Sequence, residues 1–402
     1  MKNNKIVGLV LFEFPAFSET FFINLIKTLT KNEFIVIVLA NQRYKKFKHS
    51  KDVSFNKKGK DVKALLIFFR MINFFFAVFL TPKKCIKLFI LNKNDNQNIF
   101  KNFKSIIYSS YIVRHNLDFI NFGFVNVSLG FENVPLAMNA KSIVSMRGFD
   151  ISVFPLNHSV SYEKIFNKID VVHSISYDLL KRAYTLGLPQ NKAHTIITPA
   201  IDTKLFKLSN EKKFEVVYSL KNNRIKISSV GRLHWIKNYK DILKSLQILK
   251  YKFGVDFTFD IIGVGNEIES LNFLVNELNL SENVNFFGNL SSVQIKKVLE
   301  DSDIFIQYSL HEGFCNALIE AQCMGCVVVA SNVGAIPENI IDNVTGFLVE
   351  SQRPDLLAGK LLSIINLDSN HLKDIKLAAM HRVNTEFNLE LQAEKFLKLF
   401  SN

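Results

Sequence analysis

Hydrophobic and polar positions in residues 211–402 alternate between two regular patterns. Short apolar runs predict buried strands at residues 225–230, 257–262, 283–287, 304–307 and 327–330. Apolar residues at helical spacing predict amphipathic helices between them, at residues 239–251, 267–278, 291–300 and 314–324. Fully apolar strands joined by helices are typical of parallel sheets that are covered on both faces. This half is therefore expected to form a doubly wound α/β domain.

The first half shows the same pattern less regularly. It predicts strands at residues 5–11, 34–39, 143–146 and 170–173, and a helix at residues 18–30. Residues 41–125 do not resolve into clear elements, and we assign them to the same first sheet domain. A chain of 402 residues exceeds the usual size of one domain, so two are expected.

The expected domain boundary follows the segment Thr198-Pro199-Ala200-Ile201-Asp202. We place a first domain at residues 1–205 and a second at residues 206–385. A last helix at residues 386–402 is expected to pack back toward the first domain. Chemistry is expected in a cleft between two such domains.

Positive charge is concentrated in the first half. Residues 1–210 carry 30 Lys and Arg against 13 Asp and Glu, which leaves a net charge of +17. Residues 211–402 carry 20 Lys and Arg against 23 Asp and Glu, which leaves a net charge of −3. The two net charges add up to the +14 of the whole chain. A basic half suits an anionic membrane surface or an anionic substrate. No zinc-finger or RNA-recognition spacing is present, so nucleic acid is not expected as a partner.

Residues 64–80 are the most apolar stretch of the chain. The run is shorter than the ~20 residues that a spanning helix needs, and it contains Arg70 and Asn73. Lysines flank it on both sides. These features favour a helix that lies on a bilayer or a helix buried in the protein, and the pattern does not separate the two.

The four cysteines do not predict a disulfide framework. They are few and clustered, which indicates a reducing, cytoplasmic compartment. Cys323 and Cys326 have the spacing of a metal or redox pair, but no second pair lies nearby. Their apolar surroundings favour buried, unreactive side chains.

Two cations follow the first strand of the second half. Arg232 comes directly after Gly231, and Lys237 follows five residues later, just before a helix. Cations beside a helix start suit an anion, although such a pair on its own is more often solvated. Gly265 and Gly288 end the next two strands, where they allow a tight turn or a close backbone approach.

The segment from Glu312 to Glu320 gives the sharpest signal. Glu312 precedes a helix whose first amides are expected to be free for an anion, and Glu320 lies eight residues further along. Eight residues of helix rise ~12 Å, about the span from a sugar across a diphosphate to a ribose. The alternative is that Glu312 caps the helix and Glu320 is a buried structural carboxylate.

Taken together and in this order, these blocks resemble the group 1 (family 4) retaining glycosyltransferases. The match covers residues 223–365 and includes Asn332 to Glu338 and Gly346 to Val349. The resemblance implies the GT-B fold, in which two Rossmann-like domains face each other across a cleft. It is closest to subfamilies that build exopolysaccharide or other surface glycans.

The resemblance also implies roles for single residues. Arg232, Lys237 and Glu312 would be catalytic, the two cations holding the leaving diphosphate while Glu312 orients the sugar. The nucleotide sugar would be bound by residues at the strand ends and the helix start: Gly265, Gly288, Gly313, Phe314, Cys315, Asn316 and Glu320. No Asp-x-Asp triplet stands at a strand end, so neither a metal nor another cofactor is expected.

The acceptor side matches more thinly. Ser18 and Glu19 lie in a stretch similar to surface-glycan subfamilies, and Arg147 and Asp150 lie in a second one. Arg147 stands where the family has a histidine, which leaves its role open. The expected acceptor is a growing polysaccharide or a lipid-linked glycan, at the inner face of the cell membrane. Two alternatives remain: a nucleotide-sugar epimerase on the same fold, and a non-catalytic scaffold.

Overall fold

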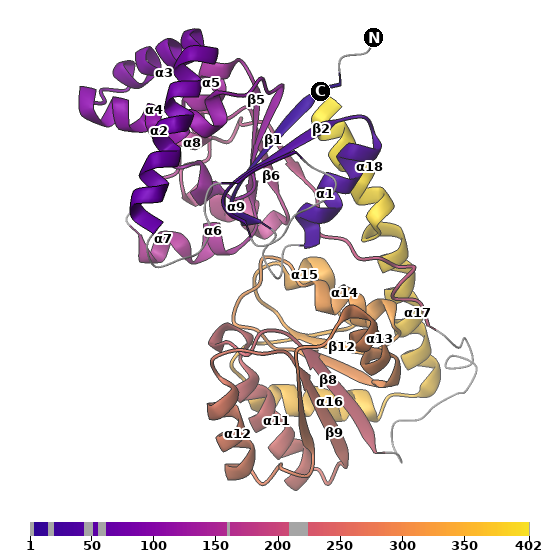
Figure 1. Cartoon of the computed structure of the whole chain (residues 1–402). Helices are drawn as coiled ribbons and strands as arrows, with labels where there is room; N and C mark the ends of the chain where they lie inside the picture. The colour runs from indigo at the N-terminus through magenta and orange to yellow at the C-terminus, as the bar shows by residue number, and fades with distance from the viewer. Residues whose placement is uncertain are drawn as a thin grey trace. The chain divides into compact units, whose positions relative to one another are not determined.

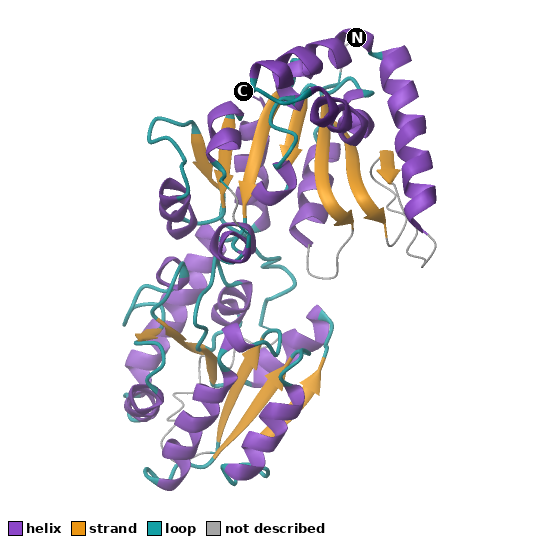
Figure 2. Ribbon diagram, turned by 90° about the vertical axis from the view of Figure 1, so that its left-hand side faces the viewer, coloured by secondary structure: helices purple, strands orange, loops and turns teal. Residues whose placement is uncertain are grey.

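The computed structural model describes residues 4–14, 20–43, 51–54, 62–158, 161–208 and 224–401. The chain divides into two compact units, each built on one parallel sheet (Figures 1 and 2). Unit 1 comprises Met1–Ile197 and Ala393–Asn402, and unit 2 comprises Thr198–Gln392. The prediction of two Rossmann-like, doubly wound α/β domains is confirmed.

Unit 1 contains a seven-stranded sheet in the order β3-β2-β1-β4-β5-β6-β7. Its strands are β1 (Ile6–Phe14), β2 (Ile35–Arg43), β3 (Lys51–Ser54), β4 (Phe119–Phe122), β5 (Lys141–Met146), β6 (Val171–Ser174) and β7 (His194–Ile196). Its longer helices are α1 (Thr20–Lys31), α2 (Val62–Leu80), α3 (Pro82–Asn94), α4 (Ile99–Val113) and α9 (Tyr177–Thr185). Short helices complete it: η1 (Val125–Ser128), α5 (Val134–Met138), α6 (Phe149–Ser152), α7 (Phe154–Asn157) and α8 (Glu163–Lys168).

The stretch that the sequence did not resolve contains three helices in succession. α2, α3 and α4 all come between β3 and β4 and contact one another (Figure 1). The periodicity of α2 was hidden because its solvent-exposed side is as apolar as its buried side. Among the described residues, no helix has the length and apolarity needed to cross a bilayer.

Unit 2 contains a six-stranded sheet in the order β10-β9-β8-β11-β12-β13. Its strands are β8 (Ile225–Val230), β9 (Phe257–Ile262), β10 (Val284–Gly288), β11 (Ile304–Gln307), β12 (Val327–Ser331) and β13 (Phe347–Val349). Its helices are η3 (Trp235–Lys237), α11 (Tyr239–Tyr251), α12 (Ile268–Glu277), α13 (Ser292–Asp301), α14 (Asn316–Cys323), α15 (Ile336–Asn339), α16 (Pro354–Ile365) and α17 (Ser369–Glu386). The strands and helices predicted between residues 225 and 330 agree with these bounds to within a few residues at their ends. The sequence pattern did not separately predict η3, α15, β13, α16 or α17.

The sheet of unit 2 is buried on both faces, as its apolar strands predicted. Along β12, Val327 and Val329 join the core under α11 and α16, whereas Val328 and Ala330 join the core under α14 and α17. Successive side chains of a strand point to opposite faces, so a strand covered on both sides must be apolar throughout.

Strand order in unit 2 reverses between β8 and β11. The chain runs outward from β8 through β9 to β10, then returns to β11 on the other side of β8. In open α/β sheets such a reversal leaves a crevice at the carboxyl ends of the strands, where ligands bind. The loops after β8 and β11 carry Arg232, Lys237 and Glu312, which were singled out in the sequence.

The last helix, α18 (Leu389–Ser401), begins in unit 2 and ends in unit 1. Phe400 is fully buried in the core of unit 1, with ring centroids 5.5 Å from Phe119 and 6.4 Å from Phe34. Ile201 and Phe206 pack in a core of unit 2, which explains why the units divide before Thr198 and not after residue 205.

Candidate functional site

The loops after β8 and β9 are held against each other by close backbone contacts. The Gly231 amide donates to the Ile262 carbonyl (2.9 Å), and the Leu233 amide donates to the Val264 carbonyl (3.0 Å). A Cβ at Gly265 would lie 2.1 Å from the Leu233 carbonyl oxygen. Gly265 therefore has a structural reason to be glycine, independent of any ligand.

Gly288 differs from Gly265 in its surroundings. Its φ is +66°, and a Cβ there would meet no atom within 4 Å. Its carbonyl accepts from the Gly263 amide (2.8 Å), which continues the sheet contact one strand further. The described residues thus leave space beside Gly288 at the strand end.

Lys237 and Glu312 form an ion pair at the point where the strand order reverses. Lys237 Nζ lies 2.5 Å from Glu312 Oε1, although 75 residues separate them in sequence. The two side chains are only 16% and 12% exposed, so water screens the pair weakly. Burial opposes the charged form of Lys237, but the acidic groups around it, Glu312 foremost, together raise the pKa of the lysine.

Within the described residues, only one carboxylate oxygen of Glu312 accepts hydrogen bonds. Its Oε1 accepts from Lys237, from Ser309 Oγ (2.7 Å) and from Gln307 Nε2 (3.2 Å). In the part of the chain that the structure describes, Oε2 has no hydrogen-bond partner. One oxygen therefore fixes the side chain, and the other is available to a ligand hydroxyl.

Arg232 behaves differently from Lys237. Its side chain is exposed, and it forms no hydrogen bond or ion pair within the described ranges. Its backbone is nonetheless placed by the Gly231 and Leu233 contacts with the β9 loop. Arg232 is thus an exposed cation with no side-chain partner among the described residues, next to backbone that hydrogen bonds hold in place.

The loop before α14 leaves two amides available. Between Glu312 and α14, neither the Gly313 nor the Phe314 amide has an acceptor among the described residues. Asn316, the first residue of α14, is exposed. Two free amides next to the Lys237–Glu312 pair are suited to an anion.

The expectation that the Cys315 amide also faces an anion is corrected by the structure. That amide donates to Asn339 Oδ1 (3.2 Å), and Cys315 is 4% exposed. Burial raises the pKa of its thiol to about 12, and the charges of Glu312, Lys237 and Glu320 all act on it. Cys315 therefore lies among the three charged residues but is itself part of the core.

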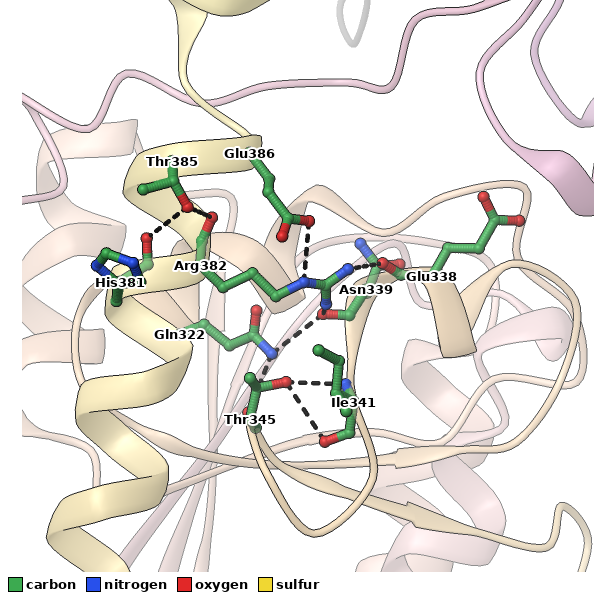
Figure 3. A network of polar contacts seen from close by, with 9 residues as sticks. All are labelled: Gln322, Glu338, Asn339, Ile341, Thr345, His381, Arg382, Thr385 and Glu386. Carbon is green, nitrogen blue, oxygen red and sulfur yellow. Dashed lines mark hydrogen bonds and ion pairs between the residues drawn. The ribbon is translucent and has the colours of Figure 1, made fainter.

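Asn339 belongs to a polar network that supports the start of α14 (Figure 3). Its carbonyl accepts from Gln322 Nε2 (3.2 Å) and from Arg382 Nη1 (2.9 Å). Gln322 also donates to the Thr345 carbonyl (3.1 Å), and Arg382 to the Glu338 carbonyl (2.8 Å). The network ties α14, α15 and α17 together, which fixes the loop that presents Gly313 and Phe314.

Three residues of the site were not expected from the sequence: Asn339, Gln307 and Ser309. Asn339 directly follows the Asn332 to Glu338 segment that resembled the family pattern, so its position was a usable signal. The same segment places Gly334 against Glu312, where a Cβ would lie 2.4 Å from the Glu312 carbonyl oxygen. Gln307 and Ser309 carried no signal, because a strand end gives no indication of which side chains it will meet.

Glu320 lies on α14, one face of which is buried. Its carboxylate has no hydrogen-bond or ion-pair partner in the described part of the chain, and burial raises its pKa to about 7. An unpaired, partly buried carboxylate is a poor stabiliser of a fold and a good binder of hydroxyl donors.

We expect Glu320→Gln to stabilise the protein at pH 8 relative to the parent, but not at pH 4. Between pH 4.5 and 7 the folded state keeps a proton on Glu320 that the unfolded state has lost, so stability falls as pH rises. The full effect is up to about 3 kcal/mol, because each unit of pKa shift corresponds to about 1.4 kcal/mol.

The measurement is urea unfolding of both proteins at a series of pH values. A difference in unfolding free energy that does not change with pH would contradict the expectation. Glu277→Gln, at an exposed carboxylate on α12, is the matched control.

The expected acceptor-side residues of unit 1 divide into three cases. Ser18 and Glu19 lie outside the described residues. The Arg147 guanidinium lies 3.7 Å from the centroid of the Phe21 ring, and its Nε donates to the Gly123 carbonyl (3.1 Å). Stacking on an aromatic ring fixes the plane of the guanidinium at the end of β5.

Asp150 is buried, so the structure does not place its side chain on the surface, where an acceptor contact was expected. It is 0% exposed, and its carboxylate accepts from the amides of Val125 (3.1 Å), Arg147 (3.0 Å) and Gly148 (2.9 Å). Burial raises its pKa, against these donors, which lower it. Asp150 orders the loop on which Arg147 stands.

All four cysteines are buried, as expected, and none of them forms a disulfide. Cys323 Sγ donates to the Phe206 carbonyl (2.9 Å), and Cys326 Sγ donates to the Leu299 carbonyl (3.2 Å). Among the described residues, no group of three or more His, Cys, Asp or Glu side chains is arranged to hold a metal ion.

Comparisons with known proteins find matches for the region of the chain that contains this site. Residues 210–382 match the family model described as Glycosyl transferases group 1. The amylovoran biosynthesis glycosyltransferase AmsK of Erwinia amylovora is 27% identical over 277 residues, which cover 67% of this chain and 66% of that protein. The putative colanic acid biosynthesis glycosyltransferase WcaL of Escherichia coli is 27% identical over 262 residues, which cover 63% of this chain and 62% of that protein. The chain thus spans about two thirds of the length of these relatives.

Solved structures show the same fold over the whole chain. HepE of Anabaena, in complex with UDP and glucose, has a TM-score of 0.70 at 16% identity and covers 99% of this chain and 100% of that one. A glycosyltransferase of Rickettsia africae has a TM-score of 0.68 at 21% identity, and the match covers 99% of this chain and 98% of that one. Residues 210–382, which lie in unit 2, thus match the group 1 glycosyltransferase model, and the whole chain has the GT-B fold that the sequence resemblance implied.

Proposed function

We propose that this protein is a retaining, metal-independent glycosyltransferase that moves a sugar from a nucleotide-sugar donor to a hydroxyl of a glycan acceptor. The observation that carries the proposal is the Lys237–Glu312 pair beside two free amides at the strand-order reversal. Its parts match the parts of a nucleotide sugar: cations and amides for the diphosphate, and carboxylate oxygens for hydroxyl groups.

The division of roles follows from the contacts. Lys237 uses one N–H on Glu312 and retains two further donors for a phosphate oxygen. Arg232 supplies a second cation, and the Gly313 and Phe314 amides supply neutral donors. As the glycosidic bond breaks, charge grows on the leaving phosphate, and donors that are already in place stabilise it without reorganisation.

The two carboxylates have separate tasks in this proposal. Glu312 presents Oε2 to a sugar hydroxyl while Oε1 stays anchored on Lys237, Ser309 and Gln307. Glu320, which has no partner of its own among the described residues, accepts from ribose hydroxyls. Gly265 supports this arrangement through the backbone, and Gly288 and Asn316 border it.

The acceptor is proposed to be a growing polysaccharide or a lipid-linked glycan. The names of the relatives support it, since both refer to polysaccharide biosynthesis. Arg147, held flat on Phe21, is the proposed contact on unit 1 for an acceptor oxygen. The net charge of +17 on residues 1–210 supports work at the cytoplasmic face of an anionic membrane.

Donor binding is the first test. We expect one of UDP-, GDP- or dTDP-sugars to raise the melting temperature of the parent protein and to bind measurably by calorimetry. Because ribose hydroxyls stabilise the ionised form of Glu320, binding near pH 7 should release a fraction of a proton. Glu320→Ala should weaken donor affinity by ~10-fold or more and abolish that release, whereas the control Glu277→Gln should change neither.

The reaction is tested with the donor that binds. Transfer with retention of anomeric configuration, unaffected by a metal chelator, is the expected result of product analysis. A changed sugar in the absence of any acceptor would instead show an epimerase. The absence of binding across the whole donor panel would leave a non-catalytic scaffold.

A further inference from the structure

Helices α2, α3 and α4 lie together in unit 1 (Figure 1). They expose many large apolar side chains. On α2, every exposed residue from 71 onward is apolar, and Phe79 is 79% exposed. The opposite side of α2 is anchored, since Ala77 is fully buried and Asn73 accepts from Arg114 (2.5 Å). The apolar side is thus a fixed surface of a packed helix.

The two following helices, which contact α2, also expose apolar side chains. α3 exposes Ile86 and Ile90, and α4 exposes Ile99, Phe100 and Phe103, of which Phe100 is 88% exposed. Single exposed apolar residues are ordinary, but a cluster on three neighbouring helices marks a surface that contacts something.

Lysines accompany these apolar side chains. On α3 and α4 five of them are exposed: Lys83, Lys87, Lys93, Lys101 and Lys104. The one acidic residue between residues 70 and 114, Asp95, pairs with Lys164 and Lys168 at 2.9 and 2.5 Å. The surface therefore carries a clear excess of positive charge that nothing on these helices offsets.

An open groove of about 540 Å³ lies along the basic side of α4. Lys101, Lys104 and Tyr108 line it, and the Arg70 guanidinium lies 4.1 Å from the centroid of the Tyr108 ring. Two lysines therefore line the groove, and a third cation, Arg70, lies against one of its lining residues, Tyr108.

This combination distinguishes an anionic bilayer from a second copy of the chain. Two copies meeting through this surface would bring their lysines together, which costs free energy through repulsion of like charges. An anionic bilayer accepts both components, with apolar side chains entering the acyl boundary and lysines facing lipid phosphates.

We propose that the exposed faces of α2, α3 and α4 form a docking surface for an anionic lipid bilayer. Phe79 and Phe100 enter the interface, and the lysines of α3 and α4 contact the headgroups. The inference extends the proposed membrane location of the enzyme, but it rests on this surface and not on the reaction.

The test is flotation of the full-length protein with vesicles, in the absence of donor and acceptor. We expect binding to vesicles of phosphatidylglycerol and phosphatidylcholine, much weaker binding to phosphatidylcholine alone, and loss of binding with added salt. The double variant Phe79→Glu/Phe100→Glu should reduce binding at least ~10-fold, because both side chains lose their apolar burial and meet like charge. Both positions are mostly exposed, so the fold should persist.

Phe273→Glu is the matched control, since Phe273 is 67% exposed on α12 in unit 2. Absence of binding by the parent, or equal binding by the double variant, would overturn the proposal. Analytical sedimentation provides a further check. If the parent is a dimer and the double variant is a monomer, the surface binds a second copy of the chain, and the bilayer proposal is overturned. Failure of vesicle binding would leave the proposed glycosyl transfer standing, because donor binding and product analysis do not use a membrane.

Discussion

Replacing Lys237 with methionine is expected to lower kcat/KM for glycosyl transfer by ~10²–10³-fold. This is the usual effect of removing one preorganised donor to a charge that develops in the transition state. Lys237 is the cation that the structure places among the loops at the strand reversal, 2.5 Å from Glu312 and 16% exposed. Methionine keeps most of its length and apolar stem, so the loss reports on the ammonium group.

The same substitution is expected to destabilise the fold. Without Lys237 the Glu312 carboxylate stays mostly buried and keeps only its bonds to Ser309 and Gln307. An unpaired buried charge typically costs about 3–5 kcal/mol. Lys244→Met is the control, because Lys244 is 53% exposed and pairs with Asp241 at 3.8 Å, a surface contact worth at most about 1 kcal/mol.

The double variant Lys237→Met/Glu312→Gln separates stability from activity. It removes both charges, so chemical unfolding should recover most of the stability lost by the single variant. Initial-rate kinetics should show no recovery of kcat/KM, because neither the cation nor the carboxylate is present. Recovery of activity together with stability would mean that the pair serves only the fold.

Replacing Gly263 with alanine is expected to destabilise unit 2 by about 3–5 kcal/mol. Gly263 has a φ of +143°, a conformation that L residues rarely adopt, and a Cβ there would lie 1.9 Å from the Gly231 carbonyl oxygen. The first effect costs about 1–3 kcal/mol and the displacement of packed backbone a similar amount. Any relief must move the β8 loop that carries Arg232.

Gly254→Ala provides the comparison for this prediction. Gly254 also has a positive φ (+69°), but a Cβ there would meet nothing within 4 Å. Its substitution should cost only about 1–2 kcal/mol, the price of the left-handed conformation. Chemical unfolding of the two variants measures the difference, and equal losses would show that the contact with Gly231 yields without strain.

Much of unit 2 could be predicted because its strands and helices follow from short local patterns of apolar and polar residues. Apolar strands such as residues 327–330 and amphipathic helices such as residues 239–251 follow from periodicity alone. The stretch at residues 41–125 could not be resolved, since the exposed side of α2 is apolar and removes the contrast on which periodicity depends. In the sequence, an apolar helix face that is exposed in the folded chain cannot be distinguished from a face that is buried in the core.

The sequence by itself determined which residue types stand at the strand ends, and in what order: Arg232 and Lys237, then the glycines, then Glu312 to Glu320. Only the tertiary structure decided their partners. It paired Lys237 with Glu312 because β11 lies next to β8, although β9 and β10 come between them in the chain. In the folded chain the Cys315 amide donates a hydrogen bond to Asn339, and Asp150 is buried inside unit 1. Hydrogen-bond partners distant in sequence depend on strand order and loop contact, which no local pattern encodes.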